Sequence, residues 1–156
     1  MIAEAVVALS LAAKVPPPRK FLSVDAHRHR VTITLIASYD SENGGFNFDG
    51  YSRFLRWTVP RGWTVQVVCK NRGPLRHSCA VVRGAGSTKL AFRGAAIRDP
   101  ELGLEAGRTA RFTFRATKTG VYRFACLVAG HEVARMWDVL EIVRRGRPSV
   151  ADLRAG

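Results

Sequence analysis

Three residue types that bind soft metal ions recur at equal spacing in the second half of the sequence. The segment CLVAGHEVARMW, residues 126–137, holds Cys126, His131 and Met136, with four residues between each neighbouring pair. Thiolate, imidazole and thioether donors suit copper, whereas magnesium and calcium prefer oxygen donors. Because Cys126 ends one expected strand and Trp137 begins the next, the loop between them would present all three donors to one ion.

A second histidine can complete this donor set. His77 lies near the start of another expected strand, and strand ends from distant parts of a β-sandwich meet at one rim. Two His, one Cys and a weakly bound Met form the ligand set of a mononuclear copper site that exchanges electrons. A distant thioether leaves the ion nearly trigonal, so a change of valence requires little rearrangement. We therefore expect the ligands His77, Cys126, His131 and Met136.

Zinc, a dinuclear copper centre and covalent catalysis fit these residues less well. Structural zinc sites use short pairs such as C-x2-C and do not recruit Met, and the sequence has no such pair. A dinuclear copper centre would need a second Cys within 127–130, where none occurs. Nucleophilic Cys–His catalysis would leave Met136 unexplained. The remaining alternative is that a buried Cys, a packed Met and a surface His have no common role.

The hydrophobic pattern predicts an all-β domain. Short runs rich in Val, Phe, Thr and Trp alternate with turns rich in Gly, Pro, Asn and Asp. About seven strands result, spaced as in an antiparallel sandwich. Residues 83–107 are rich in Gly and Ala and predict a long excursion with little regular structure. The expected strands are 31–38, 54–60, 63–71, 75–82, 108–116, 120–126 and 137–143.

The two ends of the sequence differ from this domain, which we place at residues 21–144. Residues 2–13 are as apolar as the core of an export signal, although Glu4 and the missing positive start argue against one. We expect residues 1–20 to be the remnant of a signal or membrane anchor, or a flexible lead. Residues 145–156 are basic and contain Pro148, which predicts a flexible, solvated tail.

The net charge of +13, from 25 Lys and Arg against 12 Asp and Glu, favours acidic partners. Nucleic acid is one such partner, but the basic residues are scattered and form no nucleic-acid-binding motif. We therefore expect an acidic protein partner and no nucleic acid.

The segment CLVAGHEVARMW, taken with NRGPLRH at residues 71–77, resembles the cupredoxin family. The resemblance is strongest to its sulfocyanin and rusticyanin branch, whose ligand loop reads C-x4-H-x4-M, and it covers roughly residues 31–143. It implies a Greek-key β-sandwich of seven to eight strands and one copper ion held by the same two His, one Cys and one Met. Ala129 stands where the family often has Pro, and Arg135 where it often has Gly.

The resemblance also implies a function. Its members carry single electrons and transform no substrate, so we expect a monomeric carrier outside the cytoplasm and not an enzyme. Partners would be redox proteins that dock on an apolar patch beside the copper. A copper-delivery module and a metal-free interaction domain are the alternatives. Asn71 and Ser78 would orient the first His ligand. The docking patch would comprise Leu127, Val128, Ala129 and Gly130.

The remaining thiols, Cys69 and Cys79, both point inward by their strand phase. They could form a disulfide if their strands face each other at the required distance. Free Cys is also a common small buried residue, and this is the interpretation we favour.

Overall fold

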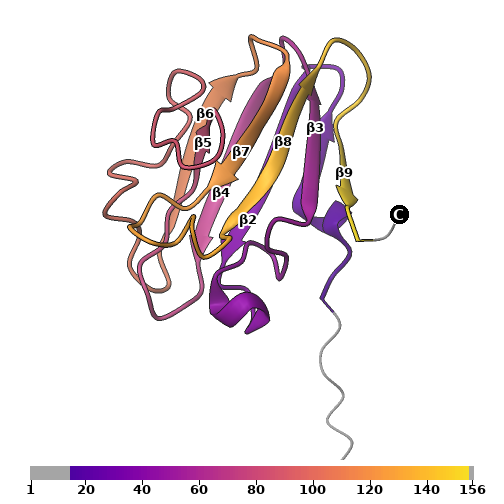
Figure 1. Ribbon diagram of the computed structural model, residues 1–156. Coiled ribbons are helices and arrows are strands. Elements are labelled where there is room, and N and C mark those ends of the chain that lie inside the picture. The colour runs from indigo at the N-terminus through magenta and orange to yellow at the C-terminus, as the bar shows by residue number, and fades with distance from the viewer. Residues whose placement is uncertain (1–14, 155–156) are drawn as a thin grey trace, which may run out of the picture.

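The protein, described here by a computed structural model over residues 15–154, folds into two β-sheets packed face to face (Figure 1). The first sheet has the order β1-β2-β4-β6 and the second the order β5-β7-β8-β3-β9. Two short 3-10 helices, η1 (Pro18–Phe21) and η2 (Glu42–Gly45), accompany them. The strands are β1 (Leu22–Asp25), β2 (Arg30–Ala37), β3 (Leu55–Pro60), β4 (Thr64–Asn71), β5 (Ala80–Val82), β6 (Thr109–Arg115), β7 (Gly120–Ala125), β8 (Trp137–Val143) and β9 (Ser149–Asp152).

Alternating burial along the strands builds the core between the sheets. On β2 and β4 every second side chain is fully buried, because successive residues of a strand point to opposite faces. The second sheet contributes Trp57, Phe124 and Leu140 to the same core. Trp57 and Phe124 meet edge to face, with ring centroids 6.4 Å apart. The all-β sandwich expected from the sequence is confirmed.

Two strand pairs are parallel, although the spacing of the strands in the sequence is that of an antiparallel sandwich. β2 pairs with β4, and β3 pairs with β8, both in parallel. The reason lies in the connections. The chain leaves the first sheet after β2, forms β3 in the second sheet and returns for β4, so β2 and β4 run in the same direction.

The strand expected at residues 75–82 is much shorter in the structure. Only Ala80–Val82 forms β5, and the segment before it is irregular apart from a single bridge between His77 and Leu104. The Gly-Pro turn at 73–74 interrupts the chain here, and His77 lies in the irregular stretch that follows. β1 was not expected, because its four residues lack strong alternation.

The excursion at residues 83–107 has little regular structure, as expected. Isolated bridges connect its Leu90 to Val82 and its Ala96 to Ala80. These contacts cover the outer side of β5, which would otherwise be an exposed sheet edge. The excursion therefore closes the second sheet on the side nearest His77.

The expectation of a solvated C-terminal tail is wrong. Ser149–Asp152 forms β9, which pairs antiparallel with β3, and Pro148 is buried. The expected signal or anchor lies mostly in residues 1–14, outside the described residues. Phe21 of η1 is buried in the core. Within residues 15–154, no helix has the length and hydrophobicity that a membrane crossing requires.

The packing of β9 gives a first prediction. Val150 lies opposite Trp57 and packs against the core, whereas the neighbouring Ala151 is exposed. Val150→Asp should lower the free energy of unfolding by about 1–3 kcal/mol, because it places a charge against apolar side chains. Ala151→Asp, the matched control, should change it by less than about 0.5 kcal/mol. Urea unfolding measures both, and equal effects would contradict the assigned strand.

Candidate metal centre

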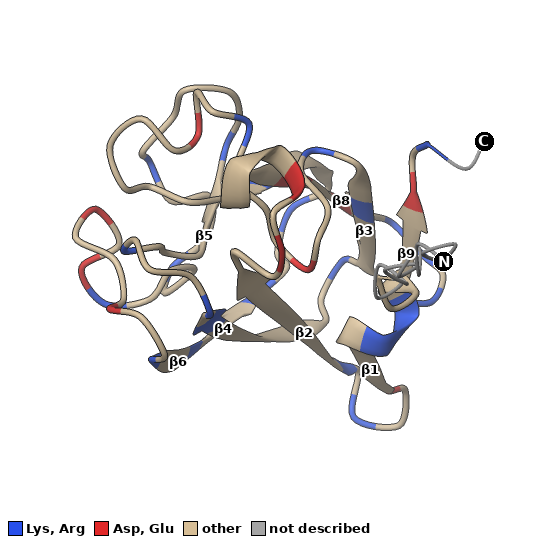
Figure 2. Cartoon of the chain, turned by 90° about the horizontal axis from the view of Figure 1, so that it is seen from below, with Lys and Arg blue, Asp and Glu red and all other residues tan. Residues whose placement is uncertain are grey.

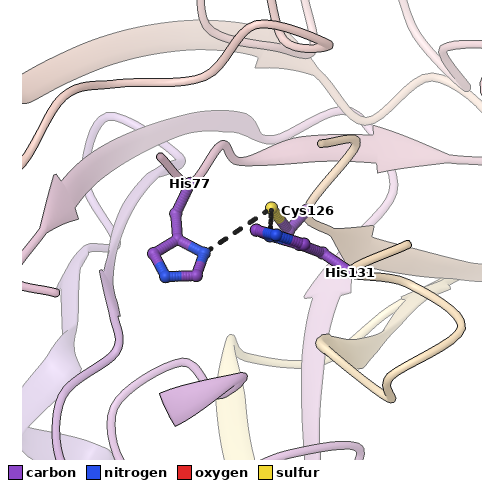
Figure 3. A group of neighbouring side chains, drawn as sticks. All are labelled: His77, Cys126 and His131. Carbon is purple, nitrogen blue, oxygen red and sulfur yellow. Dashed lines mark hydrogen bonds between the residues drawn. The ribbon is translucent and has the colours of Figure 1, made fainter. Parts of the chain in front are cut away.

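Three of the four expected ligands converge at one end of the sandwich (Figure 3). Cys126 Sγ lies 3.3 Å from His131 Nδ1 and 4.0 Å from His77 Nδ1. The donor atoms of all three residues lie within 4.8 Å of one another. Both imidazole rings turn a nitrogen toward the sulfur, as Figure 3 shows. The site thus joins one segment near residue 77 to another 49 residues further along the chain.

The connection between β7 and β8 supplies Cys126 and His131 and also carries Met136. Cys126 directly follows β7, and Met136 directly precedes β8. The Cys126 N–H donates to Met136 O (3.2 Å), and the Met136 N–H donates to His131 O (3.1 Å). Met136 is fully buried. The backbone of these three residues is therefore tied together at the base of the loop.

The excursion at 83–107 holds His77 in place. The His77 N–H donates to Leu104 O (3.3 Å), and the Leu104 N–H donates to His77 O (2.7 Å). Gly103 lies next to this pair with φ +82°, and a Cβ there would stand 2.8 Å from Val128 and 3.0 Å from His77 O. Only glycine allows this close approach of three segments.

Ser78 contacts the sulfur directly. Its N–H donates to Cys126 Sγ (3.3 Å), and its hydroxyl lies 3.7 Å from the same atom. The hydroxyl oxygen also accepts the Leu127 N–H at 2.8 Å. Ser78 therefore joins the His77 segment to the Cys126 segment through three hydrogen bonds.

Asn71 acts on the segment that carries His77 rather than on the imidazole. Its side-chain N–H groups donate to Leu75 O (2.7 Å) and Leu104 O (2.8 Å), and its carbonyl oxygen accepts the Gly73 N–H at 3.0 Å. These bonds close the turn between β4 and His77 and fasten it to the excursion. Asn71 is buried, so its side chain has few competing water partners.

Burial sets the protonation of the donors. It lowers the pKa of His77 to about 4, with a smaller contribution from the nearby His131, and it lowers the pKa of His131 as well. Both imidazoles are then neutral at neutral pH, the form that binds metal. Burial raises the pKa of the Cys126 thiol, and hydrogen bonds from Ser78 and Val128 oppose this rise. Metal binding would therefore release one proton from the sulfur.

Phe46 packs against both histidines and was not identified from the sequence. Its ring meets His131 edge to face at 4.9 Å and His77 at 6.2 Å, centroid to centroid. Asn43 of η2 holds it there, because its amide donates to Phe46 O (2.9 Å) and to Ala134 O (2.7 Å). Ala134 lies in the connection between β7 and β8, residues 126–136, which we name the ligand loop. In the sequence, Phe46 is only an aromatic residue that follows Gly44 and Gly45 in an expected loop. Nothing in that pattern indicates a contact with the histidines.

A second group missed from the sequence braces the outer side of the ligand loop. Glu132 forms a half-buried ion pair with Arg123 of β7 and accepts the Gly86 N–H at 3.3 Å. The Arg123 guanidinium also lies over the Trp137 ring, 3.7 Å from its centroid. This cluster fastens the loop to both neighbouring strands and to the excursion.

The two remaining cysteines form a disulfide. The sulfurs of Cys69 and Cys79 are bonded, with the Cα atoms 6.0 Å apart, so the expectation of two free buried thiols is wrong. The prediction that both side chains point inward is confirmed, since both residues are buried in the core. The disulfide could not be predicted from the sequence, because the position of Cys79 depends on the irregular segment before β5.

The expected docking residues differ in exposure. Ala129 and Gly130 are exposed and Val128 is partly so, but Leu127 is only 9% exposed. Two surface pockets lie between this loop and the excursion. Leu127 and Thr88 line both of them. Val133 of the same loop, which was not included in the patch, is 85% exposed.

Comparisons with known proteins agree with this arrangement. The family model of the Sulfocyanin (SoxE) domain matches residues 17–146. Auracyanin from Roseiflexus castenholzii is 26% identical over 72% of this chain and 96% of its own, with a TM-score of 0.52. Auracyanin A of Chloroflexus aurantiacus, described as a "blue" copper protein, is 21% identical over 73% and 99%, with a TM-score of 0.53.

A larger protein contains the same fold. The blue copper oxidase from Nitrosomonas europaea is 21% identical over 72% of this chain but only 38% of its own length, with a TM-score of 0.54. A search of curated proteins found no match.

Arg135, just before Met136, adopts a conformation that suits glycine. Its φ is +70°, in the left-handed region, and its side chain is exposed. The Arg135 N–H donates to Glu132 O (2.9 Å), so the turn is closed despite the strain. Any side chain with a Cβ, that of Ala included, is disfavoured in this backbone conformation in the same way as Arg.

Arg135→Gly should therefore raise the free energy of unfolding of the metal-free protein by about 0.5–1 kcal/mol, since it relieves the left-handed backbone. Arg135→Ala removes the same charge and keeps the Cβ, so it should give no comparable gain. Thermal unfolding of both variants measures the difference. Equal stabilisation by the two would assign the effect to charge and not to backbone conformation.

Proposed function

We propose that this chain, which belongs to the sulfocyanin family of cupredoxins, holds one copper ion and carries single electrons between redox partners. Cupredoxins bind copper, and the donors here suit it. The proposed equatorial ligands are His77, Cys126 and His131, with Met136 as the axial ligand. The observation that supports this most directly is the clustering of three donor atoms, from distant segments, within 4.8 Å.

The chain's own residues prepare this site. The imidazoles are neutral at neutral pH, so no proton has to leave them when a metal binds. The Ser78 N–H stabilises the deprotonated sulfur. Copper, when bound, supplies the one-electron chemistry, and a soft thiolate with two imidazoles suits both of its valences. Ligands fixed by strand ends and hydrogen bonds change little between valences, which favours rapid electron exchange.

Burial of three of the four proposed donors supports a carrier in preference to an enzyme. Cys126 and Met136 are fully buried, and His77 is 2% exposed. Phe46 covers the histidine rings from a further side. A substrate would need direct access to the metal, whereas an electron can leave through the covalent and hydrogen-bonded contacts around it. We also propose an extracytoplasmic location, because the Cys69–Cys79 disulfide suits an oxidising compartment.

The absorption spectrum tests the copper site. After addition of Cu(II), the wild-type protein should develop an intense visible band from thiolate-to-copper charge transfer. Cys126→Ser should abolish that band, since Cys126 is the free cysteine of the described chain. Repeated chemical reduction and reoxidation should return the band without loss of metal. Absence of the band in the wild type would refute the site, and metal loss on each reduction would favour copper delivery.

The exposed part of the ligand loop is the proposed docking surface. It comprises Ala129, Gly130 and Val133, with Val128 at its edge, and Leu127 forms its buried base. Figure 2 views the sandwich from below, and Lys and Arg occur on many of the segments seen there, among fewer Asp and Glu. With a net charge of +13, the chain would attract an acidic redox partner, and the exposed Arg135 lies on the same loop.

Ala129→Asp should slow electron exchange with an acidic redox partner by roughly tenfold, because it adds a like charge to an apolar contact. The matched control is Val121→Asp, which places the same charge on an exposed residue at the other end of β7. Stopped-flow measurement at low ionic strength gives both rates. Equal slowing by the two variants, or none by either, would contradict the proposed surface.

A further inference from the structure

We propose that the Cys69–Cys79 disulfide is a positioning cross-link for the metal centre, which holds Ser78 and His77 against Cys126. The proposal deepens the function proposed above and rests on it for the role of copper. Its structural part concerns the contacts of Ser78 and His77 with Cys126, which are contacts within the protein.

One end of the disulfide is anchored in the most regular part of the fold. Cys69 lies in β4, an inner strand of the first sheet, and pairs with Leu35 of β2 on one side and Ala110 of β6 on the other. It is fully buried in the core between the sheets. A residue hydrogen-bonded within a sheet on both sides has little freedom to move, so it makes a firm anchor.

The other end lies in an irregular segment next to the ligands. Cys79 follows Ser78 directly and lies two residues after His77, before β5 begins at Ala80. Among the described residues, the backbone bonds of His77 and Cys79 run to the excursion: His77 exchanges two with Leu104, and Cys79 O accepts the Ile97 N–H at 3.2 Å. The excursion is itself irregular. The disulfide therefore gives this segment a covalent connection to a central strand of the opposite sheet.

The contacts that depend on this segment are sensitive to small shifts. The Ser78 N–H to Cys126 Sγ distance is 3.3 Å, and the His77 Nδ1 to Cys126 Sγ distance is 4.0 Å. A movement of Cys79 by a fraction of an ångström would change both. An N–H that donates to the thiolate withdraws electron density from it, which disfavours the oxidised metal. Loosening that bond should therefore lower the reduction potential.

A simpler role for the bond would be stabilisation of the fold. A disulfide that closes a loop of 10 residues stabilises any protein by restricting its unfolded state. That role affects unfolding but leaves the folded metal centre unchanged. The experiment therefore has to read the folded site directly, under conditions in which each variant remains folded.

The test variant is Cys69→Ala/Cys79→Ala, which removes both sulfurs and leaves no new thiol to compete for copper. Cys69→Val/Cys79→Ala, which refills part of the lost volume, serves if the first variant folds poorly. The control is Val31→Ala, a cavity in β2 of the same sheet, which lowers stability without cutting the cross-link. Circular dichroism establishes that each protein is folded at the assay temperature.

The first measurement uses metal-free protein and follows alkylation of Cys126, which is fully buried in the wild type. The double variant should react roughly tenfold faster or more, because the cover that Ser78 provides opens more often. Val31→Ala should react at nearly the wild-type rate. This result does not depend on copper, so it stands even if the wild type shows no thiolate-to-copper band.

The second measurement uses the copper-loaded proteins. The double variant should bind copper about tenfold more weakly, with an altered charge-transfer band and a lower reduction potential. Val31→Ala should keep the wild-type band and potential. A double variant that is merely less stable, with wild-type alkylation rate, band and potential, would overturn the proposal. Equal changes in the control would overturn it as well.

Discussion

The hydrogen bond from the Ser78 N–H to Cys126 Sγ is the contact on which the metal centre depends. It joins two segments 48 residues apart, and the Leu127 N–H to Ser78 Oγ bond reinforces it from the other side. His77 is adjacent to Ser78, so the position of one histidine relative to the sulfur follows from this contact. The disulfide at Cys79, the Leu104 bridge and the turn closed by Asn71 all act on the same short segment.

The fold could be predicted from the sequence where burial alternates strictly. β2, β4 and β8 were expected within a residue or two, because each buries every second side chain. The parallel pairings were not predictable. Alternating burial identifies a strand, but it does not show which strand lies beside it in the sheet. β9 was missed because four residues after Pro148 carry too little pattern against a basic background. The strand around His77 was predicted too long because the segment between the turn at 73–74 and Ala80 bonds to Leu104 and Cys126 and not to a neighbouring strand.

The site was more predictable than the fold around it. The spacing of Cys126, His131 and Met136 is local in sequence, so residue type and spacing could identify it, and a sandwich rim could be expected to bring His77 near. Phe46, Gly103 and the Arg123–Glu132 pair could not be found in the same way, because their roles depend on contacts between distant loops. The disulfide was not predicted for the same reason, since neither cysteine's partner follows from strand phase alone.

An assembled donor site lowers the stability of the chain that holds it. Burial lowers the pKa of His77 and raises the pKa of the Cys126 thiol, and Arg135 adds a left-handed backbone at the ligand loop. A disulfide that closes a 10-residue loop contributes on the order of 2–3 kcal/mol in the opposite direction. In the folded chain the same bond ties the irregular segment that carries Ser78 to β4. The same bond can therefore offset the cost of the site and fix its geometry.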